Sequence, residues 1–289
     1  MASDITLTAS MRSNLVSLQS TADTMATTQT RLATGKKVNT ALDNPASFFA
    51  AAGFNQRASL LNGLKDNISD GIQMVKAADA GVKALTSLIE NLRGQLSQAR
   101  SALSESTSAS SLDTIATQYN VIIKQMNSIS QTDSHYKGVN FLANNDITVN
   151  FNEEASTSLT LSGFDGSATA TGGLAISGGS STSTGAGTLT SGDMTTSTAI
   201  QSIEDTLNTA LTTLQDESAT LANNLSILNV RNAFITDMTN TLADGANKLV
   251  AADQNEEGAN MLMLQTRNSL GTTSLSLASQ AAQGVLRLF

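Results

Sequence analysis

The chain has 289 residues, a net charge of −8, no cysteine, no tryptophan and only 3% aromatic residues. Without a basic face it is not expected to bind nucleic acid, and without cysteine it has no disulfide, thiolate metal site or cysteine nucleophile. No segment resembles a signal peptide, and none approaches the roughly eighteen apolar residues of a membrane-spanning helix. We therefore expect no membrane insertion.

The amino-terminal segment carries an apolar stripe that steps by four and three residues, as in helices that pack against other helices. We predict a helix over residues 6–33, capped by Gly35, with Lys36 and Lys37 at the negative end of its dipole. A connector is expected over residues 35–43. The stripe consists of Met11, Leu15, Leu18, Ala22, Met25, Gln29 and Leu32.

Three more helices are predicted in the middle of the chain. The first begins at Asn44-Pro45, because Asn is a good N-cap and Pro is tolerated at the first helical position. It carries an apolar stripe from Leu61 to Leu103. After a Ser-rich break at residues 104–111, a second stripe covers residues 112–129, and a return helix follows from Leu211 towards Leu249. Matching stripes predict an antiparallel bundle.

The segment between these helices changes character. Residues 147–151 and 159–161 alternate between apolar and polar side chains, which predicts a β-hairpin. Residues 165–198 are of low complexity, with Ser, Thr, Gly or Ala at 28 of 34 positions. Such a segment has little apolar surface to offset its ordering entropy. We expect a surface insert that is partly or wholly flexible or thinly folded.

The carboxyl-terminal segment carries a second stripe that continues to the last residue. Chain ends are normally poorly ordered, so stripes at both ends predict that the terminal helices pair with each other and are buried against other molecules. We expect the ends to be disordered in the monomer and ordered in an assembly. The predicted assembly surface comprises Met11, Leu15, Leu18, Met25, Leu32, Leu264, Leu275, Ala278, Ala282, Val285 and Phe289.

No residue is predicted to be catalytic, to bind a cofactor or to ligate a metal. His135 is the only histidine and has no cysteine or second histidine to act with it. Residues 66–71 resemble the start of a calcium loop, but Ala77 stands where the loop requires glutamate. A peptidase insert with the pattern His-Glu-x-x-His is excluded by the single histidine. We therefore expect a protein that is not an enzyme.

Motifs at both ends resemble those of the bacterial flagellins. The amino-terminal ones are Arg-Leu-Ala-Thr-Gly at 31–35, Asp-Asn-Pro-Ala at 43–46 and Asn-Ile-Ser-Asp-Gly-Ile at 67–72. The carboxyl-terminal ones are Asn-Glu-Glu at 255–257, Leu-Gln-Thr-Arg at 264–267 and Leu-Arg-Leu-Phe at 286–289. The resemblance covers roughly residues 1–142 and 200–289.

The resemblance implies a secreted, extracellular subunit of the flagellar filament that assembles with itself; it leaves open whether paralogous flagellins join the same filament. It further implies export through the flagellar type III apparatus with a chaperone, and polymerisation beneath a cap. It divides the chain into five parts. These are an inner-tube helix with connector (1–43), the first part of a central bundle (44–142), a hairpin with a surface insert (143–199), the second part of the bundle (200–249) and a second inner-tube helix (250–289).

Two alternatives and one departure from the family accompany this interpretation. The alternatives are the hook–filament junction protein, which shares such termini, and a secreted coiled-coil adhesin, which requires an anchor or signal peptide. The departure concerns an arginine-rich segment that toll-like receptor 5 recognises in many flagellins. Here residues 88–98 contain a single arginine, Arg93. We expect weak or no recognition by that receptor.

Overall fold

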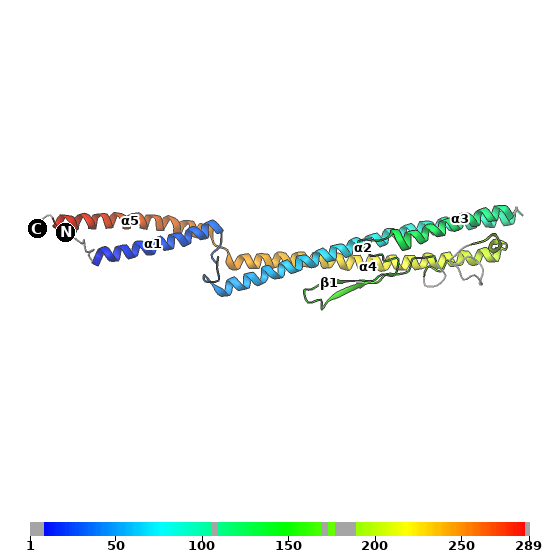
Figure 1. The fold of residues 1–289 in the computed structure, drawn as a ribbon, viewed down its shortest axis with the longest axis horizontal. Coiled ribbons are helices and arrows are strands. Elements are labelled where there is room, and N and C mark those ends of the chain that lie inside the picture. Colours follow the sequence, from blue (N-terminus) through cyan, green and yellow to red (C-terminus); the bar gives the residue numbers. More distant parts are fainter. Residues whose placement is uncertain (1–8, 106–108, 169–172, 177–188, 287–289) are drawn as a thin grey trace. The chain divides into compact units, whose positions relative to one another are not determined.

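The computed structural model describes the chain except for residues 1–8, 106–108, 169–172, 177–188 and 287–289 (Figure 1). The described residues are mainly α-helical and form one small antiparallel sheet, which confirms the predicted fold class. In chain order the elements are α1 (Ala9–Thr34), α2 (Pro45–Ser104), α3 (Ala109–Ser128), the π-helical turn η1 (Ile129–Asp133), β1 (Ile147–Asn150), β2 (Ser158–Leu161), the 3-10 turn η2 (Ser191–Met194), α4 (Ser197–Val250) and α5 (Gln254–Leu286).

The chain forms two compact units. The terminal unit consists of residues 1–59 and 239–289, and the central unit consists of residues 60–238. The central unit has a continuous apolar core, to which α2 contributes the predicted stripe. Buried members of that stripe are Leu61, Ile68, Val75, Ala78, Val82, Leu85, Ile89, Leu92, Leu96 and Ala99, and α4 contributes Leu207, Leu214, Leu221, Leu228 and Ile235.

The start of α2 is fixed by its N-cap. The backbone N–H of Ser47 donates to Oδ1 of Asn44 at 3.1 Å, and Pro45 takes the first helical position. Asn satisfies an otherwise unpaired amide, while proline has no N–H to satisfy there. The predicted start of this helix is confirmed.

The predicted hairpin is also present. β1 pairs antiparallel with β2, with Ile147 opposite Leu161 and Asn150 opposite Ser158. The hairpin lies close to α2, where a Cβ at Gly71 would be 3.1 Å from the Val149 side chain. The guanidinium of Arg231 on α4 stacks over the ring of Phe151 at 4.9 Å, which adds a cation–π contact.

The described parts of residues 165–198 are more firmly anchored than their composition indicates. Asn120 on α3 both donates to the carbonyl and accepts from the N–H of Leu189, each at 2.7 Å. The N–H of Ala168 donates to Oδ1 of Asn127 at 2.8 Å. The side chains of Leu174, Ile176, Leu189 and Met194 are buried. The few large apolar residues in the segment thus anchor it to the core, and the prediction of flexibility otherwise falls on residues outside the described ranges.

Candidate assembly surface

Helices α1 and α5 of the terminal unit pack against each other along their lengths (Figure 1). In each contact between the two helices, the residue numbers of the two partners add up to nearly the same value. Asn14 donates to Ser274 Oγ at 3.1 Å, and Arg31 donates to Glu257 at 3.0 Å. A constant sum means that the two helices run antiparallel. The predicted pairing of the two ends is therefore present within one chain.

The ion pair between Arg31 and Glu257 joins residues 226 positions apart. The Glu257 side chain is only 9% exposed and the Arg31 side chain 31% exposed. Glu257 also stands in the first turn of α5, where the positive end of the helix dipole favours a carboxylate. This pair fixes the register of α1 against α5 at the connector end.

The two helices pack closely at Gly271. A Cβ there would be 2.7 Å from Cδ2 of Leu18. Glycine lets the leucine side chain of α1 lie directly on the α5 backbone, as small residues do where helices pack closely. Of the predicted assembly residues on α5, Leu264, Leu275 and Ala278 are half-buried.

The residues of the amino-terminal stripe differ in burial. Met11 is buried, and Leu18, Met25 and Leu32 are half-buried. The other three residues of the stripe, Leu15, Ala22 and Gln29, are exposed. The residue before each of them lies on the inner side instead; these are Asn14, Thr21 and Thr28. Both sets share the heptad period, and the inner set is the less apolar one.

Threonine suits these inner positions because its hydroxyl is satisfied locally. The Thr21 hydroxyl donates to the carbonyl of Ser17 at 2.8 Å, which leaves its methyl group free to pack against α5. The α1–α5 contact is therefore thin and partly polar. The side chains of Ala282 and Val285, together with Phe289, lie outside the described residues.

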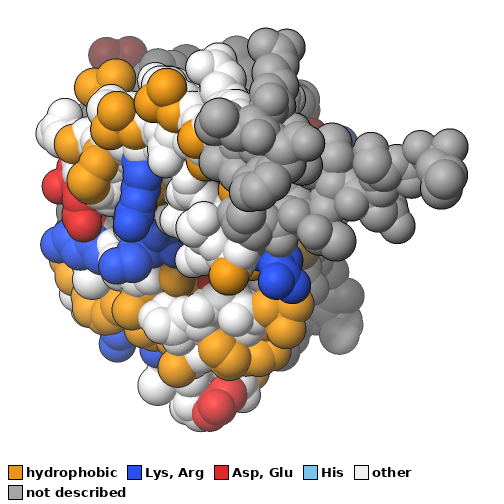
Figure 2. All heavy atoms as spheres, turned by 90° about the vertical axis from the view of Figure 1, so that its left-hand side faces the viewer, with side chains coloured by type: hydrophobic (Ala, Val, Ile, Leu, Met, Phe, Trp, Pro, Cys, Tyr) orange, Lys and Arg blue, Asp and Glu red, His pale blue; other side chains and the backbone are white. Residues whose placement is uncertain are grey.

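A second apolar stripe on α5 was missed by the sequence reasoning. Met263, Leu270 and Leu277 recur every seven residues and are 62%, 66% and 62% exposed. Leu262 beside them, and Leu15 and Val16 on α1, are exposed as well. Figure 2 shows hydrophobic side chains on the face that includes this unit, beside several Lys and Arg side chains. The seven-residue spacing was the available signal.

The connector between α1 and α2 is tied to the break between α4 and α5. The N–H groups of Lys37 and Val38 donate to the carbonyl of Val250 at 2.7 and 3.3 Å, and Ala252 donates to the carbonyl of Gly35 at 3.0 Å. Gly35 has φ of 67°, which favours glycine at this turn. These hydrogen bonds hold the α1–α2 connector against the residues that join α4 to α5.

The same connector holds an exposed leucine on a well-defined turn. Oδ2 of Asp43 accepts from the backbone N–H of Asn39 and of Thr40, at 2.9 and 2.8 Å, and from the Thr40 hydroxyl at 3.2 Å. These hydrogen bonds to backbone amides lower the pKa of Asp43. Leu42, next to Asp43, is 94% exposed.

Sites for small-molecule chemistry are not evident within the described ranges. Among the described residues, no group of three or more His, Asp or Glu side chains is placed to hold a metal ion, and no described helix is long and apolar enough to cross a membrane. His135 is exposed, with Nδ1 2.7 Å from the carbonyl oxygen of Thr132, in a turn. The terminal helix pair is the most distinctive surface.

Comparison with known proteins agrees with this geometry. A family profile described as the bacterial flagellin N-terminal helical region matches residues 5–146. Flagellins FljM and FljO of Caulobacter vibrioides are each 26% identical over 281 residues, covering 95% of this chain and 94% of the relative. Flagellin FljK of the same organism is 26% identical over 287 residues, with the same coverage. With the paired terminal helices and the predicted motifs, these matches over nearly the whole chain support its identification as a bacterial flagellin.

Proposed function

We propose that this flagellin, a structural subunit of the extracellular flagellar filament, polymerises through its terminal helix pair. The stripe formed by Met263, Leu270 and Leu277 supports this proposal most strongly. These side chains and Leu262 are exposed in the single chain, although a helix that is apolar on more than one side is normally buried on each of them. Neighbouring subunits supply the missing contacts in a filament.

The thin contact between α1 and α5 supports a second part of the proposal. Ordering a helix costs conformational entropy at every residue, and isolated helices are marginally stable. On α1 only Met11, Thr21 and Thr28 are buried. Both ends are therefore disordered in the free subunit and become ordered when neighbours cover the outer stripe.

This proposal is tested by electron microscopy of seeded or salted-out protein, together with limited proteolysis of a verified monomer. The expected result is long filaments, and a protease-trimmed monomer that has lost both ends and no longer polymerises. A persistent monomer whose ends resist protease would refute the proposal.

The finer partners follow from the family resemblance. The subunit is exported unfolded through the flagellar type III apparatus, with a chaperone, and adds beneath a cap. It also copolymerises with paralogous flagellins, as the similarity to three flagellins of one organism suggests. Co-assembly of two differently labelled flagellins from the source organism tests the last point; strictly separate filaments would oppose it.

Weak or absent stimulation of toll-like receptor 5 is the last part of the proposal. Arg93 is the only arginine in residues 88–98 of α2. It lines a polar groove with Glu90, Arg100 and Glu204, so acidic groups offset its charge. A strong response of receptor-bearing reporter cells to purified monomer would contradict this expectation.

A further inference from the structure

Leu42 is an apolar side chain on a preorganised turn. It is 94% exposed, while Asp43 beside it accepts three hydrogen bonds from Asn39 and Thr40 and holds the turn in one conformation. The N–H of Asp43 also donates to the carbonyl of Thr40 at 3.1 Å. A leucine presented in this way loses little conformational freedom on binding, which favours it as a binding anchor.

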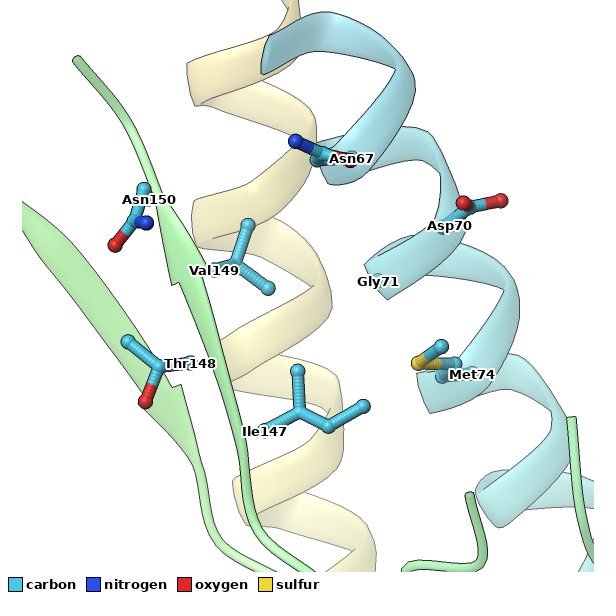
Figure 3. A pocket seen from close by; sticks show the side chains of 8 residues that line it. All are labelled: Asn67, Asp70, Gly71, Met74, Ile147, Thr148, Val149 and Asn150. Atoms are coloured by element: carbon cyan, nitrogen blue, oxygen red, sulfur yellow. The ribbon is translucent and has the colours of Figure 1, made fainter. Parts of the chain in front are cut away.

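The central unit contains a groove with apolar side chains in its lining. It has a volume of about 320 Å³ and lies between β1 and α2 (Figure 3). Ile147 and Met74 point towards one another from the two walls, and Thr148 points to the opposite side of the strand. Gly71 and the buried Val149 add further apolar lining.

The polar groups of the groove suit the backbone of an incoming turn. The amides of Asn67 and Asn150 line it and have no hydrogen-bond partner among the described residues. The N–H of Phe151 donates to Thr157 on the β2 side at 2.8 Å. Alternation along an antiparallel strand then leaves the backbone groups of Thr148 and Asn150 on the other edge of β1, which faces the groove. Backbone donors and acceptors are thus available beside an apolar floor.

We infer that Leu42 of one copy inserts into the groove formed by Met74, Ile147 and Val149 of another copy. The inference rests on the proposed function, because it names a specific contact within the polymer. Leu42 belongs to the terminal unit and the groove to the central unit. A contact between two different patches is heterologous, and repeated addition gives an open helical polymer when the rotation does not close a ring.

The absence of native cysteine gives a direct test by cross-linking. L42C subunits are mixed with M74C subunits, assembled and mildly oxidised. A disulfide needs Cβ atoms roughly 3.5–4.5 Å apart. The expected result is a cross-linked dimer from the mixture, and a ladder of multimers from the double variant. L42C mixed with V121C is the matched control, because Val121 is exposed on α3 outside the groove, and it is expected to stay monomeric under denaturing conditions.

A second measurement is independent of the cross-link. L42D is expected to raise the critical concentration for assembly about tenfold or more, as the loss of a central interface anchor does, while L42M stays near wild type. L60D, at an exposed leucine of α2 outside the groove, is expected to have a much smaller effect. Filaments without an L42C–M74C cross-link, or equal effects of L42D and L60D, would overturn the inference alone. Failure of the unmodified chain to form filaments would instead overturn the proposed function.

Discussion

Replacing Arg31 by methionine removes the cation from the ion pair that links α1 to α5. The partner that remains, Glu257, is then the largely buried member, because its side chain is 9% exposed. A buried carboxylate without its cation is strongly unfavourable, and breaking a fully buried pair costs roughly 3–5 kcal/mol. The Arg31 end is 31% exposed, so water recovers part of this loss. We expect about 2 kcal/mol for R31M.

The reverse change, E257Q, has a smaller expected effect. The guanidinium of Arg31 keeps its charge but is exposed enough to be solvated, and glutamine can still accept its hydrogen bond. We expect about 1 kcal/mol. If the ends fold only on assembly, these losses appear in the critical concentration, as increases of about 30-fold for R31M and about fivefold for E257Q.

Sedimentation of filaments at several total subunit concentrations measures these increases. K83M is the matched control, since the pair of Lys83 with Asp79 lies within α2 and Lys83 is 74% exposed; we expect less than about a twofold change. Equal effects of R31M and E257Q would refute the argument from unequal burial. A large fall in the melting temperature of the R31M monomer would refute the argument that the ends fold on assembly.

Three further predictions concern other contacts. G271A places a Cβ 2.7 Å from the end of the Leu18 side chain, so we expect weaker assembly by about 1 kcal/mol, restored by the second change L18A. Burial raises the pKa of Glu217, so the folded state disfavours the charged carboxylate and loses stability as pH rises through that pKa. E217Q is therefore expected to be more stable than wild type at neutral pH, by less than about 1 kcal/mol. At a pH below that pKa the two proteins are expected to have the same melting temperature. N120A leaves the buried N–H and carbonyl of Leu189 unpaired, and urea unfolding is expected to show a loss of about 2 kcal/mol; an unchanged midpoint would mean that water replaces the amide.

The sequence was most informative where one face of a helix is both apolar and buried. The α2 stripe from Leu61 to Ala99 was recognised because large aliphatic side chains recur there at heptad spacing over many turns, and the same positions are buried. The N-cap at Asn44 and the hairpin were recognised because capping and alternation are local signals. In each case the tertiary contact agrees with the local preference.

The terminal helices were harder to interpret because their inner face is not their most apolar face. On α1, Thr21 and Thr28 lie inside while Leu15 and Val16 are exposed. Threonine satisfies its hydroxyl on its own helix, as Thr21 does on Ser17, so an inner position does not need an apolar residue. The groove and Leu42 were missed for a different reason, since each depends on which residues the fold brings together or leaves exposed.

This distribution of side chains has a consequence for assembly. A helix pair that places threonine and asparagine on its inner side while exposing Met263, Leu270 and Leu277 leaves apolar surface for neighbours to cover. The Arg31–Glu257 pair and the bonds from Lys37 and Val38 to Val250 then act at one end of the pair, where they set register without supplying much apolar burial. We therefore propose that order in α1 and α5 is coupled to polymerisation, so that the chain is easy to unfold before assembly and becomes rigid within the polymer.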